Sequence, residues 1–76
     1  MTVSLRDLMP GDTARVAGYN ADSQYAARLM RLGLIPGTQI TVARMAPLGD
    51  PMEIRFRGFS LALRPAEAVC LLLDPT

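Results

Sequence analysis

The sequence predicts a mainly β fold, a small five-stranded barrel with one inserted α-helix. Apolar and polar residues alternate in several short runs, and glycine- and proline-rich turns separate these runs at close intervals. Only one segment, from about Ser23 to Leu32, has the spacing of a long helix. Short strands in a chain of 76 residues favour a barrel, because closure removes the edges that an open sheet would expose.

The first predicted element is a single helical turn. Ser4-Leu5-Arg6-Asp7 has the pattern of a capping box, and Leu5, Leu8 and Met9 form a short apolar turn. Pro10-Gly11-Asp12 then breaks this turn at a sharp corner.

A half-buried strand follows from Thr13 to Gly18. Ala14 and Val16 fall on one side of it, and the intervening residues fall on the other. We therefore expect one face of this strand to be in the core.

The long helix is predicted from about Ser23 to Leu32. Asp22 or Ser23 can accept hydrogen bonds from the first free amides, and apolar residues recur at one face at positions Ala26, Leu29 and Met30. Gly33 is expected to end the helix in the left-handed conformation. A Schellman motif there would place Leu34 against Leu29.

Two strands are predicted after the helix. Pro36-Gly37 fits a type II turn, because proline sets the first central φ and glycine accepts the positive second one. Beyond it, the alternation allows Val42 opposite Ile54, with a loop over residues 46–51 between the strands. A shift of one residue would turn the apolar side chains to the wrong face.

A third strand is predicted after the two-residue turn Arg57-Gly58. This hairpin pairs Ile54 with Leu61 and Met52 with Leu63. The core layers predicted from this meander are Ile40 with Phe56 and Phe59, Val42 with Ile54 and Leu61, and Met52 with Leu63.

The last predicted strand runs from Val69 to Leu73, after a one-turn helix over residues 64–68. Its residues are apolar without a break, so we expect both of its faces to be covered, which leaves room for a homodimer. The five strands together predict an SH3-like barrel.

Composition limits the function. Residues 1–76 are expected to form one domain, and the net charge of +1, with eight arginines and no lysine, does not favour nucleic acid as a partner. The single cysteine excludes an internal disulfide, and the sequence has neither an apolar run long enough to span a membrane nor a signal peptide. We expect a cytoplasmic protein without a transmembrane segment.

The sequence offers little for catalysis. It has no histidine and no lysine, and its acids are scattered at turns, so we do not expect an enzyme. Cys70 is interpreted as a small buried apolar residue. No metal site and no required cofactor are predicted, although scattered carboxylates leave weak or adventitious binding of a divalent metal open: Asp22, Asp50, Glu53, Glu67 and Asp74.

One surface is predicted to bind a partner. Arg28 and Arg31 are three residues apart near the C-terminus of the helix, where cations complement the helix dipole. A solvated face that complements the helix dipole is the simpler explanation. A surface that docks on an anionic partner is the alternative, because arginine is favoured at interface hot spots. The candidate partner-binding set is Tyr25, Arg28, Arg31, Leu34, Ile35 and Met45.

Taken in order, several short motifs resemble the FeoA family, ferrous iron transport protein A, and the FeoA-like domain of metal-dependent regulators of the diphtheria toxin repressor type. The matching motifs are Ser4-Leu5-x-x-Leu8-x-Pro10-Gly11-Asp12, Leu29-x-x-Leu32-Gly33-Leu34-x-Pro36-Gly37-Thr38, Ala46-Pro47-Leu48-Gly49-Asp50-Pro51, Gly58, and Leu63-Arg64-x-x-Glu67-Ala68. Most matching positions are core residues or turn residues, so they describe a fold. The structural turn residues are Gly11, Gly33, Pro36, Gly37, Gly49 and Gly58.

The resemblance implies an SH3-like barrel and a cytoplasmic, non-enzymatic accessory protein that binds or regulates the membrane ferrous iron transporter FeoB at its cytosolic G-protein part. An alternative is a metal-dependent regulatory or sensor domain that binds a transition metal weakly. An SH3-like barrel that binds nucleic acid is a further alternative, although the aromatic residues do not form a stacking platform on a basic groove. With no tryptophan, the sequence also lacks the aromatic groove of a domain that binds proline-rich peptides.

Overall fold

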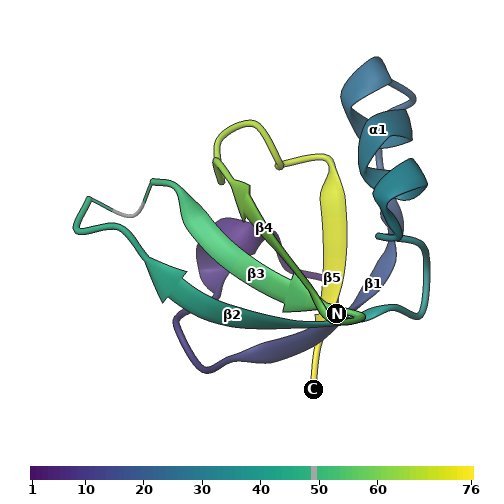
Figure 1. Cartoon of the computed structure of the whole chain (residues 1–76). Coiled ribbons are helices and arrows are strands. Elements are labelled where there is room, and N and C mark those ends of the chain that lie inside the picture. Colours follow the sequence, from purple (N-terminus) through teal and green to yellow (C-terminus); the bar gives the residue numbers. More distant parts are fainter. Residues whose placement is uncertain (49) are drawn as a thin grey trace.

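A computed structural model describes residues 1–48 and 50–76 and shows a strongly curved antiparallel sheet with one long helix (Figure 1). The five strands lie in the order β4-β3-β2-β1-β5. The mainly β fold with one inserted helix, predicted from the sequence, is confirmed. The elements are η1 (Leu5–Asp7), β1 (Thr13–Tyr19), α1 (Gln24–Leu32), β2 (Gln39–Met45), β3 (Met52–Phe56), β4 (Phe59–Leu63) and β5 (Leu71–Pro75).

The hydrogen-bonded sheet has two ends, β4 and β5. The outer edge of β5 is taken by Val3, which exchanges two main-chain hydrogen bonds with Leu73, of 2.7 and 2.9 Å. This edge is therefore not available to β4. Within the described residues, β4 pairs only with β3, so one seam of the barrel stays open.

Both ends of α1 form as the sequence predicts. Ser23 caps the first turn, since its Oγ accepts a hydrogen bond of 3.1 Å from the amide of Ala26. Gly33 has a φ of 115°, which is left-handed and unfavourable for residues with a Cβ. Its amide donates to the carbonyl of Met30, and the amide of Leu34 donates to the carbonyl of Leu29, both at 3.1 Å. These two bonds define a Schellman motif.

The predicted strand register is also correct. Val42 pairs with Ile54, Ile54 with Leu61, and Met52 with Leu63. The turn between β3 and β4 has positive φ at both central residues, 51° at Arg57 and 81° at Gly58, as in a type I′ turn. A bulge in β2 between Val42 and Arg44 was not predicted from the alternation.

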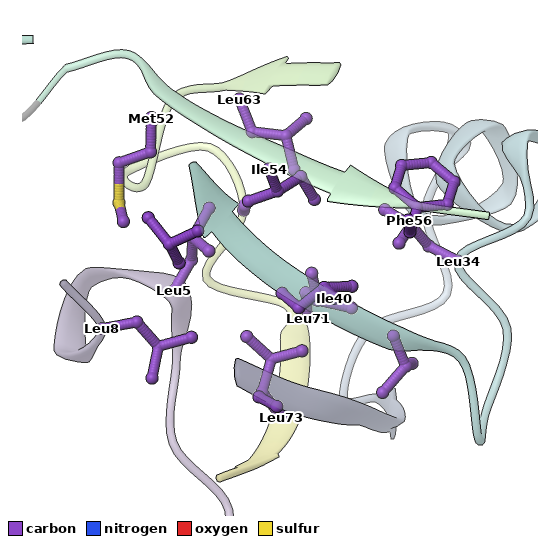
Figure 2. Close-up of a cluster of buried hydrophobic side chains, with 14 of the residues drawn as sticks. Leu5, Leu8, Leu34, Ile40, Met52, Ile54, Phe56, Leu63, Leu71 and Leu73 are labelled. Atoms are coloured by element: carbon purple, nitrogen blue, oxygen red, sulfur yellow. The ribbon is translucent and has the colours of Figure 1, made fainter. Parts of the chain in front are cut away.

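Buried side chains from all five strands, η1 and α1 form one cluster inside the sheet (Figure 2). Leu5, Leu34, Ile40, Met52, Ile54, Leu71 and Leu73 are the largest of the side chains with no exposed surface. Burying one such aliphatic side chain contributes about 1.5–3 kcal/mol relative to leaving it in water. The cluster therefore stabilises the sheet and fixes the N-terminal turn against it.

Three apolar residues predicted to lie in or near this core are exposed instead. Phe59 is 63% exposed because it follows the tight turn on the edge strand β4, beyond the end of the core. Met30 is 39% exposed, because the short α1 buries only a narrow stripe, Ala26 and Leu29. Met9 is exposed next to the corner after η1.

The last strand begins at Leu71, two residues later than predicted. Residues 64–68 form hydrogen-bonded turns and no helix, and Val69 is 48% exposed because the chain has not yet reached the sheet. Cys70 and Leu71 are buried, while Leu72 is half-buried. The expectation that both faces of this strand are fully covered is therefore wrong.

The predicted turn residues lie in turns where the structure describes them. Pro36 and Gly37 form a turn that is closed by a 3.0 Å hydrogen bond from the amide of Thr38 to the carbonyl of Ile35. Positive φ values at Gly11 and Gly37 agree with their predicted roles. Gly49, the remaining predicted turn residue, lies outside the described residues.

Candidate functional site

The structure brings together three of the predicted partner-binding residues on α1. Tyr25, Arg28 and Arg31 are spaced three residues apart, so they follow one flank of the helix. They line a shallow hollow of about 530 Å³. Arg28 and Arg31 are exposed, and neither pairs with a carboxylate within 4.0 Å in the part of the chain that the structure describes. Their charges are therefore available to an anionic partner.

Tyr25 connects this flank to the turn that precedes β5. Partial burial is the main cause that raises the pKa of its hydroxyl above 10.0, and the electrostatic effects of Glu67 and Cys70 act in the same direction. The cation of Arg28 opposes them. Glu67 thus lies close enough to α1 to act on Tyr25, and it lines the same hollow as Tyr25 and Arg28.

Leu34 does not belong to the candidate surface. It has no exposed area, because the Schellman motif turns the residue after Gly33 back onto the helix and into the core. Ile35, the next residue, is 39% exposed at the exit of α1. Of the predicted apolar patch beside the helix, the structure retains Ile35.

Met45 lies at the far end of β2, away from α1. It pairs with Met52 and is partly buried against the core. Figure 1 shows α1 and the C-terminal end of β2 on opposite sides of the molecule. The predicted set brings Met45 close to Ile35 only if the strand after the helix is short. The seven residues of β2 span about 20 Å, and Met45 lies at the end that is farther along the chain from Ile35.

A groove between α1 and β4 was missed by the sequence analysis. Two hollows of about 320 and 330 Å³ share Leu32 of α1 and Leu61 of β4 and so lie next to each other along this groove. Leu32 is 46% exposed, and the exposed Phe59 lies at one end. One feature of the sequence points to this groove: Leu32 directly precedes Gly33, the residue that ends the helix. A residue in the last turn lies beyond the stripe of side chains that the helix buries.

The remaining ionisable residues do not gather into a metal centre. In residues 1–48 and 50–76, no group of three or more histidine, cysteine or acidic side chains could hold a metal ion. Glu53, one of the predicted weak ligands, accepts from Arg44 at 3.1 Å and lies 3.8 Å from Arg55. The groups available at the surface of α1 can make charge-assisted hydrogen bonds and apolar contacts.

The longest helix in the described part of the chain is α1, and it is too short and too polar to cross a membrane.

Residues 3–75 match the family model of the FeoA domain. Over 64 residues the chain is 31% identical to an Fe(2+) transport protein A/Fe(2+) transporter FeoB fusion protein from Porphyromonas gingivalis. That match covers 84% of this chain and 8% of the fusion protein, so the chain spans a small fraction of this relative's length.

Solved structures of similar proteins share the fold. The solution structure of a FeoA-like protein from Clostridium acetobutylicum superposes with a TM-score of 0.87 at 32% identity, covering 97% of this chain and 86% of that one. A FeoA from Stenotrophomonas maltophilia, crystallised with zinc and described as a procaryotic SH3 domain protein, superposes with a TM-score of 0.80 at 28% identity, covering 97% and 89%. The predicted SH3-like architecture is thereby confirmed.

Proposed function

The chain belongs to the FeoA family, and on that premise we propose that it is a non-enzymatic, cytoplasmic accessory protein of ferrous iron transport that binds the cytosolic part of FeoB. One observation carries this proposal: in the relative from Porphyromonas gingivalis, Fe(2+) transport protein A and FeoB form one polypeptide. Fusion keeps two modules at a high effective concentration, which benefits modules that act on each other.

The surface of α1 supports the proposal. Arg28 and Arg31 present two cationic groups without an acidic partner among the described residues, beside the half-buried ring of Tyr25. Ile35 adds apolar area at the exit of the helix. Arginine and tyrosine are the residue types that contribute most at protein interfaces, because both offer large planar groups and hydrogen bonds.

We further propose that the protein needs no resident metal or cofactor, with ferrous iron as the cargo of the transporter. The arrangement of acids supports this, since Glu53 is engaged by Arg44 and Arg55. The zinc in the relative from Stenotrophomonas maltophilia makes a weak metal-binding or sensor role the second candidate.

A titration of the purified chain with the cytosolic part of FeoB from the same organism tests the proposal. Saturable binding of that part supports an accessory protein of the transporter. Binding of ferrous iron or zinc by the chain alone, without binding of FeoB, would support the second candidate instead.

A further inference from the structure

Among the residues that the structure describes, the edge strand β4 pairs on one side only and leaves main-chain groups free on the other. In a two-residue hairpin the residues that flank the turn exchange both main-chain hydrogen bonds, and bonded and non-bonded pairs then alternate along the ladder. Here Phe56 pairs with Phe59, and Ile54 pairs with Leu61. The amides and carbonyls of Ser60 and Ala62 therefore point away from β3, towards the open seam of the barrel.

These free groups border the groove between α1 and β4. Ala62 lines the hollow of about 320 Å³, and Ser60 lines the hollow of about 330 Å³. Across the groove lies Leu32, and the inner part is lined by Leu61. The groove thus combines a row of unpaired main-chain groups with an apolar wall, which is the arrangement to which an extended peptide can add as a strand.

The charged side chains around the groove favour a negatively charged segment as its ligand. Arg28 and Arg64 line one hollow and Arg31 lines the other, against a single acid, Glu67. In the described part of the chain, none of these three arginines has a carboxylate within 4.0 Å. An acidic segment would complement this excess of positive charge, and a basic one would be repelled.

We propose that the groove between α1 and β4 binds an extended acidic and apolar segment of the partner, which adds to the sheet as a further strand beside β4. Main-chain hydrogen bonds join the segment to Ser60 and Ala62. Alternate apolar side chains of the segment contact Leu32 and Leu61, and its carboxylates reach the arginines at the rim. This inference rests on the proposed function, because the segment is assigned to the cytosolic part of FeoB.

Strand addition predicts a specific effect of proline. The Ala62→Pro variant lacks the amide N–H that residue 62 directs away from β3. An edge strand tolerates proline at such a position, because the hydrogen bonds to the neighbouring strand are kept. We expect its thermal unfolding to match that of the wild type, while its affinity for the cytosolic part of FeoB falls by about tenfold or more. Arg64→Glu should also weaken binding, and Arg6→Glu on η1, which makes the same charge change away from the groove, should not.

The probes are the whole cytosolic part of FeoB and a set of overlapping synthetic peptides that cover its sequence. We expect one acidic and apolar peptide to bind, and hydrogen exchange at the amides of Ser60 and Ala62 to slow in the wild-type complex. The hydrogen-exchange measurement uses the wild-type protein, so it tests strand addition even if the Ala62→Pro variant does not fold.

The outcomes separate this inference from the function on which it rests. Equal binding of the cytosolic part to the wild type and to Ala62→Pro, with unchanged exchange at Ser60 and Ala62, would overturn strand addition and leave the accessory role in place. Absence of any binding of the cytosolic part to the wild type would overturn the accessory role, and strand addition with it.

Discussion

The hydroxyl of Tyr19, at the end of β1, donates a hydrogen bond of 2.7 Å to the carbonyl of Leu34, directly after α1. A second side chain, Thr38, donates to the carbonyl of Gly33 at 2.9 Å. Together with the two amide bonds of the Schellman motif, these contacts satisfy main-chain groups at the exit of the helix. They join α1 to the sheet and set the position of its arginines.

Replacement of Tyr19 by phenylalanine should destabilise the fold. The carbonyl of Leu34 would lose its donor in a partly buried place, which costs about 1 kcal/mol. We expect the free energy of unfolding in urea to fall by this amount without a change in slope. Tyr25→Phe is the matched control, because no hydrogen bond of the Tyr25 hydroxyl is seen within the described residues. An equal loss in both variants would contradict the role given to the bond between Tyr19 and Leu34.

Stability should fall at alkaline pH. Burial, with smaller contributions from Cys70 and Tyr25, raises the pKa of Tyr19 from 10.0 to about 12. Between about pH 10 and about pH 12 the unfolded chain loses a proton that the folded chain keeps, so unfolding becomes easier as pH rises. Below about pH 10 this group adds no pH dependence. The slope of unfolding free energy against pH should be shallower for Tyr19→Phe, and an unchanged slope would show that Tyr19 is not the group responsible.

Substitution of Gly33 should destabilise the end of α1. Its φ of 115° is unfavourable for a β-branched residue, and a Cβ there would meet Cε2 of Phe56 at 3.4 Å. We expect Gly33→Val to lower the free energy of unfolding by about 1–3 kcal/mol. Gly33→Asn should cost less, because asparagine tolerates the left-handed region better. Equal stability of Gly33→Val and the wild type would contradict this account of the helix end.

Reversal of the charges on α1 should weaken partner binding and leave the fold intact. Arg28 and Arg31 are exposed and make no ion pair in the described part of the chain, so Arg28→Glu with Arg31→Glu should lower the melting temperature only slightly, through the lost interaction with the helix dipole in the last turn. We expect its affinity for the cytosolic part of FeoB to fall by about tenfold or more, since each charge would change from attraction to repulsion.

The control for this pair is Arg6→Glu with Arg15→Glu, which makes the same change in net charge on η1 and β1. Similar weakening in both double variants would show a general effect of charge. Unchanged binding in the Arg28 and Arg31 double variant would remove α1 from the interface.

Local rules predicted the backbone well. The turn at Arg57-Gly58 fixes the hairpin register, and the alternation through Ile54 leaves one register possible, so the pairing of three strands followed from short stretches of sequence. The helix end at Gly33 was predictable for the same reason, because a Schellman motif depends on residues within six positions.

Local sequence patterns did not predict which apolar side chains at the edge of the core are exposed. Phe59 continues the alternation of Leu61 and is apolar, but its exposure depends on β4 being an edge strand, which is a property of the whole sheet. The open seam itself depends on Val3 taking the free edge of β5, a contact between the two ends of the chain. The groove beside Leu32 is bordered by this edge strand, so the local signal at Leu32 and Gly33 does not define it without the arrangement of the whole sheet.

The most direct test of the accessory role is a calorimetric titration of the purified chain with the cytosolic part of FeoB, with and without guanine nucleotide and ferrous iron. We expect saturable binding to FeoB that needs no added metal and is about tenfold or more weaker in the Arg28→Glu, Arg31→Glu double variant. Heat only on the addition of iron to the chain alone, with no binding of FeoB in any nucleotide state, would contradict the accessory role.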